Sequence, residues 1–382
     1  MSPKVNTTEH FILFDIDSAS IGGGLVRYGK DTQGKILETQ VLFSVRKNIT
    51  DGNEYPFEKF FDQTIKTFKK VAEEVHLQSL VTIDGIYINV SVPWMSAQKR
   101  IIEYTKEKPF VLSQELLDEL IQKEIEAPLH HNLEYADHDV ELIRRRTLDI
   151  YANGYRARNP IGKEMSDLRI HSLVSVISTT TKQKFYEVIE QVFHRTPQLV
   201  SNTFVNYQAM KLLLPTLDNA FIIDMSGEVT SVLVVKKDQL NHIGSIPLGT
   251  HHIVRSLRDT LGISIQKARS LIRLQSQGTL DATYEASLSK AMETAFRVWF
   301  KSFYALIDTY GQHGLLPRTM VFKTDNEHLR WCREYLLRED SLYEHMDTRG
   351  RVEMIVLSDR VPHEHSDDSE LVILSQLIHQ LK

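Results

Sequence analysis

Residues 221–235 read FIIDMSGEVTSVLVV, and this stretch decides which fold the chain can adopt. Two runs of apolar and β-branched residues, Phe221–Ile223 and Val232–Val235, flank a polar turn that contains Asp224 and Gly227. The runs predict two buried strands and the polar residues predict a tight turn between them. Such a turn can direct backbone N–H groups and one carboxylate toward a common point, as a phosphate and its Mg²⁺ require.

A second stretch of the same kind lies near the N-terminus. Residues 11–26 read FILFDIDSASIGGGLV, in which an apolar run is followed by Asp15, small polar residues and a second apolar run. One hairpin of this type is ordinary. Two of them, far apart in one chain, predict a duplicated domain that holds a single ligand between its halves.

The order of these segments resembles that of the actin-like ATPases, in particular the FtsA/PilM-like group. That group includes the cell-division protein FtsA and the type IV pilus protein PilM. The family has Asp-x-Gly-[Ser/Thr] in the first turn, Asp-x-Gly-Gly-Gly-Thr in the second, and Ile-Pro-x-Gly-Gly after it. Here residues 245–253 read SIPLGTHHI, while residues 159–162 (NPIG) and the strand 172–177 resemble the end of the family's inserted subdomain.

The resemblance covers nearly the whole chain and implies an α/β, actin-like (ribonuclease H-like) fold of two lobes. A β-α-β-β subdomain of the FtsA/PilM type is expected within the first lobe. The implied divisions are 1–93 for the first lobe, 94–178 for the inserted subdomain, 179–217 for the continuation of the first lobe, 218–249 for the second lobe, 250–316 for a helical subdomain, and 317–382 for the rest of the second lobe with a closing helix.

The family's ATP and Mg²⁺ site is carried over onto the two turns. Backbone N–H groups must approach the phosphates closely, and carboxylates hold Mg²⁺ mostly through water. The resemblance assigns catalytic and metal-binding roles to Asp15 and Asp224. It assigns cofactor binding to Asp15, Asp17, Ser18, Ser20, Asp224, Ser226, Gly227, Glu228, Gly249 and Arg273.

Several of these positions depart from the family pattern. Asp17 stands in place of a glycine, and Glu228 adds a second negative charge where the phosphates are expected. Arg269 replaces an acid near the nucleoside, and residues 319–326 contain no glycine for the adenine-side turn. Uncompensated like charges cost on the order of 1 kcal/mol each near a solvated surface. The chain is therefore expected to bind nucleotide weakly or not at all, and appreciable ATP hydrolysis is not expected.

Composition sets broad limits on function. The chain has 382 residues, 42% of them hydrophobic, which is enough for more than one core. A net charge of −5 argues against a nucleic-acid-binding protein. The single cysteine, Cys332, fits a reducing cytosol and is expected to pack as a small apolar residue. The N-terminus lacks a signal-peptide core, and no apolar run approaches the roughly 20 residues of a membrane helix.

Three functions remain open. The resemblance implies a cytoplasmic scaffold that recruits or assembles partners at the inner membrane, with membrane association only through those partners. The partner would be the tubulin-like protein FtsZ, with possible self-assembly, or a short peptide of a membrane-anchored pilus protein bound in the insertion. The second hypothesis is an active, ATP-dependent polymerising switch.

The third hypothesis is a phosphatase. Asp15-Ile16-Asp17-Ser18 after an apolar strand resembles the haloacid-dehalogenase pattern, in which Asp15 is the nucleophile and Asp17 the general acid/base. That fold requires a helix after the motif, whereas this sequence predicts a second strand.

Three further features have ordinary interpretations. Arg144-Arg145-Arg146 is expected on a solvated strand face, or else in a contact with an acidic partner. The last helix has apolar residues at helical spacing and is expected to pack on the core. Two histidine-containing groups, His130/His131/His138 and His363-Glu364-His365 with Asp367 and Asp368, have metal-ligand residue types but are expected to be polar linkers.

Overall fold

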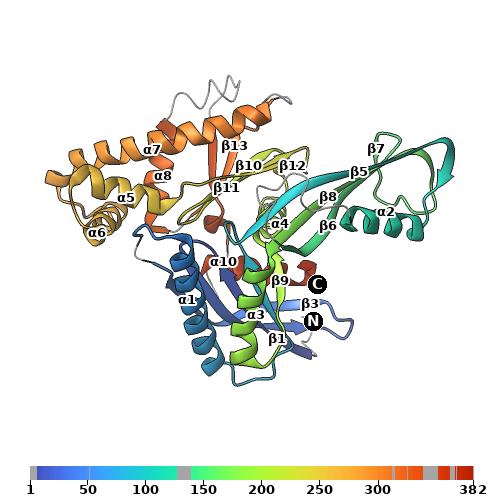
Figure 1. Cartoon of the computed structure of the whole chain (residues 1–382), viewed down its shortest axis with the longest axis horizontal. Helices are drawn as coiled ribbons and strands as arrows, with labels where there is room; N and C mark the ends of the chain where they lie inside the picture. Colours follow the sequence, from blue (N-terminus) through green and yellow to red (C-terminus); the bar gives the residue numbers. More distant parts are fainter. Residues whose placement is uncertain are drawn as a thin grey trace, which may run out of the picture.

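The computed structural model describes residues 7–50, 52–126, 139–311, 315–324, 326–338, 352–361, 366 and 368–381. They form two lobes, each built on a five-stranded sheet, and a third sheet that extends away from the lobes (Figure 1). Among the helices described, none combines the length and the apolar character needed to cross a membrane.

The two five-stranded sheets share one topology. In each, three antiparallel strands continue into two parallel strands, in the order β3-β2-β1-β4-β9 for sheet A and β12-β11-β10-β13-β14 for sheet C. This repeat confirms the duplication inferred from the two hairpins. Sheet A contains β1 (Thr7–Ile16), β2 (Ser20–Lys30), β3 (Ile36–Asn48), β4 (Gly85–Val90) and β9 (Gln198–Ser201). Sheet C contains β10 (Ala220–Met225), β11 (Thr230–Lys236), β12 (Gln239–Ile246), β13 (Thr319–Lys323) and β14 (Glu353–Val356).

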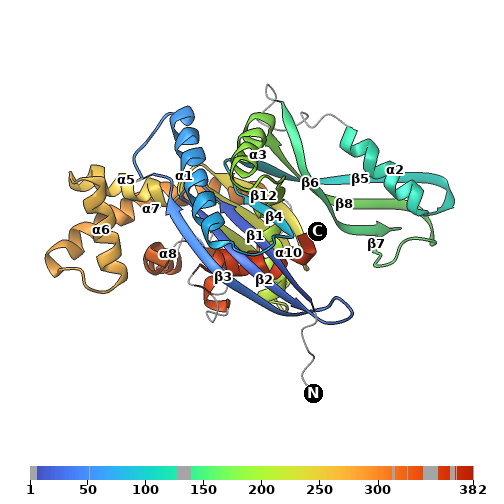
Figure 2. The same ribbon diagram turned by 90° about the horizontal axis from the view of Figure 1, so that it is seen from below.

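The apolar run of β1 is buried on both faces because helices cover both. Ile12 and Phe14 pack with α1 (Phe57–Gln78) and α3 (Thr179–Phe193). Phe11 and Leu13 point to the other face. There they join a core shared with α4 (Asn202–Leu213) and α10 (Ser369–Leu381). Figure 2 shows α10 across the sheet from α1.

That second core also includes residues of sheet C, so α4 and α10 pack against both lobes. The last helix therefore packs on the core as predicted, with Leu371, Leu374 and Ile378 buried. The other face of sheet C is covered by the remaining helices of the second lobe, with Trp299 and Cys332 fully buried among them. These are α5 (Thr250–Leu261), α6 (Ile265–Ser276), α7 (Ala282–Gly311) and α8 (Asn326–Arg338); the short 3₁₀ helix η1 (Ser358–Arg360) follows β14.

The inserted segment forms sheet B, in the order β5-β8-β6-β7. Its elements are β5 (Met95–Val111), α2 (Gln114–Glu126), β6 (Val140–Ala152), β7 (Tyr155–Arg156) and β8 (Glu164–Ser178). The predicted β-α-β-β order is present, with the two-residue β7 in addition. Most of β5 is exposed or half-buried and lacks apolar alternation, so its length depends on pairing with β8, which extends from Met95 to Val111.

Candidate functional site

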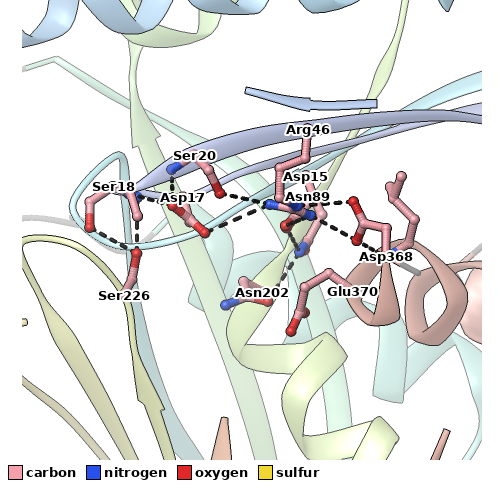
Figure 3. Close-up of polar contacts among 12 residues, drawn as sticks. Asp15, Asp17, Ser18, Ser20, Arg46, Asn89, Asn202, Ser226, Asp368 and Glu370 are labelled. Atoms are coloured by element: carbon pink, nitrogen blue, oxygen red, sulfur yellow. Dashed lines mark hydrogen bonds and ion pairs between the residues drawn. The ribbon is translucent and has the colours of Figure 1, made fainter. Parts of the chain in front are cut away.

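The two hairpin turns singled out in the sequence contact each other directly. The hydroxyl oxygens of Ser18 and Ser226 lie 2.9 Å apart, and the backbone N–H of Ser18 donates to Ser226 Oγ at 3.2 Å (Figure 3). The backbone N–H of Glu228 donates to Ser18 Oγ at 2.9 Å. Each turn thus satisfies polar groups of the other turn, at the point where the sequence predicted a ligand.

Asp17 closes its own turn. Its carboxylate accepts hydrogen bonds from the backbone N–H groups of Ala19 and Ser20, the latter at 2.7 Å. The indole N–H of Trp94 donates to the Asp17 backbone carbonyl at 2.9 Å. The N–H groups that would receive a phosphate therefore already bind an anion that belongs to the chain.

A row of buried polar side chains joins Asp15 to Asp224 across the lobes. Asn89 Nδ2 donates to Asp15 Oδ1 at 2.8 Å and to Asn202 Oδ1 at 3.0 Å. Asn202 Nδ2 then donates to Asp224 Oδ2 at 2.7 Å, and Asn206 Nδ2 donates to the same oxygen at 2.8 Å. Both aspartates lie at strand ends, on β1 and β10, and both are buried.

Two cations complete this cluster. The Arg46 guanidinium lies 3.0 Å from Asp15 Oδ2 and makes two contacts with the Asp368 carboxylate, at 2.9 and 3.1 Å. Lys323 Nζ lies 3.3 Å from Asp224 Oδ2 and 2.6 Å from Glu370 Oε2. Asp368 and Glu370 belong to the start of α10, so each cation links a strand-end aspartate to this helix.

Burial and charge shift the protonation of these groups in opposite directions. Burial acts to raise the pKa of Asp15, but the charges of Arg46 and Lys323 outweigh it and hold that pKa below its ordinary value. Burial raises the pKa of Glu370 to about 7, and the neighbouring Asp15 and Asp224 add to this effect against the opposing charge of Lys323. Asp368 and Glu370 compensate Arg46 and Lys323, whose pKa values are raised.

Glu228 points away from the Ser18 contact and into a second ionic group. Its carboxylate meets His251 Nδ1 at 3.0 Å and both terminal nitrogens of Arg255 at 3.0 and 2.8 Å. Arg255 also donates to the Gly52 carbonyl of the first lobe at 3.3 Å. Although burial acts to raise the pKa of Glu228, hydrogen bonds from His251 and Arg255 lower it to about 2.

The glycines of the turns allow backbone segments of this chain to pack closely against each other. A Cβ on Gly227 would lie 2.8 Å from the Ser18 carbonyl oxygen, and one on Gly249 would lie 2.5 Å from the Gly227 carbonyl oxygen. The N–H groups of Thr250 and His251, at the start of α5, donate to the carbonyls of Ser226 and Gly227 at 2.8 and 2.9 Å. The glycines of the motif therefore serve close packing between segments of this chain.

The nucleoside side of the predicted site is not assembled in the same way. Arg273 is exposed on α6, away from the turns. Arg269, which lies one turn earlier, contacts His251 Nε2 at 3.2 Å. Helix α6 packs on α8, and Arg330 donates to the Gln275 carbonyl at 2.9 Å. Of the predicted cofactor-binding residues, all except Arg273 thus gather at the junction of the lobes.

Sequence reasoning missed Arg46 and Lys323. The sequence does indicate Lys323, because this lysine follows an apolar run at the end of β13, just as Asp15 and Asp224 follow apolar runs at the ends of β1 and β10. No sequence pattern indicates Arg46, because its position beside Asp15 depends on the register between strands. Arg46 pairs with Gly22, which pairs with Asp15, and a Cβ on Gly22 would clash with the guanidinium that crosses it.

Comparison with solved structures decides the fold. A chain in the PilM–PilN type IV pilus biogenesis complex is similar over 100% of both chains, with a TM-score of 0.63 and 11% sequence identity. The fold is actin-like. The ethanolamine utilization protein EutJ from Carboxydothermus hydrogenoformans matches over 93% of this chain and 86% of its own, at a TM-score of 0.43 and 10% identity. A Bacteroides thetaiotaomicron protein with an actin-like ATPase fold matches over 96% of both chains, at 0.41 and 8%. No family model and no curated protein matches the chain in sequence.

Actin-like ATPase folds typically bind ATP with Mg²⁺ between the lobes, so the residues present can be tested against that ligand. A cavity of about 380 Å³ remains beside the turns, with Asp17, Asp224, Asp368 and Glu370 among its lining residues. These four carboxylates outnumber the two cations of the same lining, Arg46 and Lys323, so the net charge of the cleft repels a polyanion. The N–H groups of Ser18, Ser20, Ser226 and Glu228 already have acceptors within the chain. Within the described residues, no group of three or more His, Cys, Asp or Glu side chains could hold a metal ion. The actin-like cleft of this chain does not fit Mg²⁺–ATP.

The actin-like fold also disagrees with the phosphatase hypothesis. Asp15 and Asp17 are followed directly by β2 rather than by a helix. Asp15 is buried against Arg46 and Asn89, where a substrate phosphate has no access. The histidine groups around His130 and His363 lie outside the described residues.

A second candidate site is a groove between the insertion and the first lobe. Its volume is about 700 Å³, and it lies where β6 passes the outermost strand of sheet A, β9. Apolar and basic side chains share its walls. The lining residues are Ile121, Leu142, Ile143, Arg144, Arg145, Thr147, Tyr186, Pro197, Gln198 and Leu199.

The arginines of β6 are half-buried, so the expectation of a solvated strand face was wrong. Arg145 Nη1 donates to the Ile121 carbonyl of α2 at 2.8 Å. Arg146 lies over the ring of Phe204, and one of its terminal nitrogens, Nη2, is buried without a hydrogen-bond partner. Burial and the charge of Arg144 lower the pKa of Arg146. The buried hydroxyl of Ser201 also lacks a hydrogen-bond partner, and it lies with Arg146 in a separate, much smaller cavity rather than in the groove.

Proposed function

We propose that this chain is a cytoplasmic, PilM-like scaffold that binds a segment of a membrane-anchored partner in the groove between β6 and β9, without help from nucleotide. The observation that carries the proposal is the coincidence in this groove of a sheet's outermost strand, apolar walls and arginines. The full-length likeness to a chain of a PilM–PilN complex supports a protein partner of the pilus type rather than FtsZ.

The groove suits an extended peptide. An outermost strand can accept a further strand through its backbone, while pockets beside it select alternate side chains. Leu142, Ile143 and Leu199 supply apolar contacts for such side chains. Arg144 and Arg145 also line the groove and give it positive charge, which favours an acidic side chain of the peptide. The bound segment is therefore expected to carry apolar residues and at least one carboxylate.

The alternative of an ATP-dependent polymerising switch requires a nucleotide that both lobes hold. The direct contact of the two turns and the carboxylates of the cleft argue against it. The scaffold function requires only the groove and a partner that brings the chain to the membrane.

Binding of synthetic peptides to the full-length chain tests the proposal. Fluorescently labelled peptides would represent the cytoplasmic segments of membrane proteins encoded beside this chain's gene, and fluorescence anisotropy would report binding. At least one acidic, apolar peptide should bind with micromolar affinity. Arg144→Glu should lower the affinity for that peptide by about tenfold or more, and a tenfold loss equals about 1.4 kcal/mol of binding free energy.

The matched control is Arg158→Glu, because Arg158 is an exposed arginine of the same subdomain that does not line the groove. A peptide in which the carboxylate is replaced by lysine should recover part of its affinity for the Arg144→Glu chain. Equal affinity of the parent and Arg144→Glu chains for every bound peptide, or no binding of any peptide, would contradict the groove assignment.

A further inference from the structure

The cleft between the lobes contains more anionic side chains than cationic ones, and the cations join three parts of the molecule. Arg46 on β3 connects Asp15 in the first lobe to Asp368. Lys323 on β13 connects Asp224 in the second lobe to Glu370. We call these six residues the interlobe ion cluster.

We propose that the interlobe ion cluster replaces Mg²⁺–nucleotide and holds the two lobes of this chain closed at all times. The carboxylates of Asp368 and Glu370 stand for the anionic phosphates, and Arg46 and Lys323 stand for the neutralising cation. This inference concerns the cleft and does not rest on the proposed binding of a peptide in the groove.

The connectivity of the cluster makes closure depend on it. Helix α10 packs in the core shared by both lobes, and its first turn is bound by one cation from each. Without these cations, Asp15, Asp224, Asp368 and Glu370 would face one another in a partly dehydrated cleft. Removing one partner of a buried ion pair leaves an uncompensated charge, which is far more costly than losing an exposed pair.

The turns show what the closed state achieves. Ser18, Ser226 and the Glu228 N–H bind one another across the lobes. Arg255, held by Glu228, reaches the Gly52 carbonyl of the first lobe. These contacts join the two lobes directly, at the place where a nucleotide-dependent relative would need a bound ligand to join them.

A disulfide trap tests the proposal in the full-length chain. Ser18→Cys and Ser226→Cys would place two thiols where hydroxyls are 2.9 Å apart, so a disulfide needs only a small adjustment. Oxidised glutathione would accept the two electrons and two protons of the paired thiols and be reduced to two molecules of glutathione. The remaining thiol, Cys332, is fully buried, and burial raises its pKa, so it stays reduced and serves as an internal count.

The two introduced thiols should be lost rapidly, and at the same rate with and without Mg²⁺–ATP. In the same background, Lys323→Met should slow disulfide formation by about tenfold, because the rate follows the closed fraction and the variant should be closed only about a tenth of the time. Lys301→Met is the matched control, because Lys301 is exposed on α7 outside the cleft, and it should leave the rate unchanged. Disulfide formation that requires Mg²⁺–ATP, or a Lys323→Met rate equal to the parent's, would overturn the proposal.

A second variant covers the case in which Lys323→Met does not fold. Lys323→Met with Glu370→Gln removes the cation together with the carboxylate that it binds on α10. Circular dichroism would establish that this double variant is folded, and its disulfide should also form more slowly than the parent's. A folded double variant that closes at the parental rate would show that the cluster does not hold the lobes.

Discussion

Ser18 and Ser226 are 208 positions apart in the chain, yet their hydroxyl oxygens lie 2.9 Å from each other. Each belongs to the turn of an equivalent hairpin, one in each lobe of an actin-like fold. The contact lies where the sequence predicted a bound phosphate. The same residues that suggested a nucleotide site therefore form a contact between the lobes.

Mg²⁺–ATP should not change the thermal stability of the chain. A ligand that binds only the folded state raises stability by RT ln(1 + [L]/Kd), about 2.7 kcal/mol at one hundred times Kd. Because the turn N–H groups and the cleft carboxylates exclude a polyanion, millimolar Mg²⁺–ATP should leave the melting temperature where magnesium chloride of equal ionic strength leaves it. Differential scanning fluorimetry measures both. A rise of several degrees specific to ATP would show that the cleft accepts nucleotide.

Gly249→Ala should destabilise the chain by about 1–3 kcal/mol, the usual cost of inserting an atom into a packed site. The backbone of Gly249 is extended, with φ −134°, so the cost comes from the clash with the carbonyls of Ser226 and Gly227. Urea denaturation measures it. Gly311→Ala serves as the comparison, because its nearest neighbour would lie 3.7 Å away, and its effect should stay within about 0.5 kcal/mol. Equal effects of the two substitutions would contradict this account.

Glu370 should make the chain less stable as the pH rises from about 4.5 to about 7. Its pKa is raised by burial from 4.5 to about 7, so the folded state binds more protons than the unfolded state within that window. The stability that this difference contributes is fully present below pH 4.5 and is lost as the pH rises through 7. Glu370→Gln should flatten the dependence there, as measured by urea denaturation at several pH values.

The groups that face Glu370, namely Lys323, Asp15 and Asp224, remain in the variant, so the comparison isolates Glu370 itself. A variant whose stability falls as steeply as that of the parent between these pH values would exclude Glu370 as the cause.

Glu228 should act in the opposite direction. Its pKa is lowered to about 2 by His251 and Arg255, against the effect of burial, so its stabilisation is present above pH 4.5 and is lost as the pH falls toward 2. Glu228→Gln should therefore be less stable than the parent at pH 7, with the difference shrinking in acid. Chemical denaturation at pH 7 and at acidic pH gives the comparison. Glu285 is exposed, so Glu285→Gln should show no such trend. A difference that does not depend on pH would show that packing, and not charge, explains the loss.

Much of the fold could be predicted because local patterns agreed with the global topology. The apolar runs around Asp15 and Asp224, and their turn residues, predicted two equivalent hairpins, and both are present. Helical spacing placed α10 correctly and predicted that its apolar face would be buried. The exposed or half-buried residues of β5 carry no such pattern, and its length depended on pairing with β8.

The candidate site was predicted only in its location. Asp17 and Glu228 were recognised as charges that oppose a phosphate, but the groups that receive those charges could not be found from spacing alone. Arg46 reaches Asp15 across Gly22 through the register of three strands, and Asp368 reaches Arg46 from the other end of the chain. Contacts between positions so far apart depend on three-dimensional packing and leave no periodic signal.

By itself, the sequence determined the duplicated hairpins and the inserted β-α-β-β unit, because strand and turn propensities act over a few neighbouring residues. That the two turns would meet was expected only from the resemblance to actin-like proteins. Only the tertiary structure decided what fills that meeting point. Ion pairs and hydrogen bonds between buried groups depend on distances of about 3 Å, which arise when whole lobes pack together. In this chain, that packing places Ser18 against Ser226 and sets Arg46 and Lys323 among the carboxylates of the cleft.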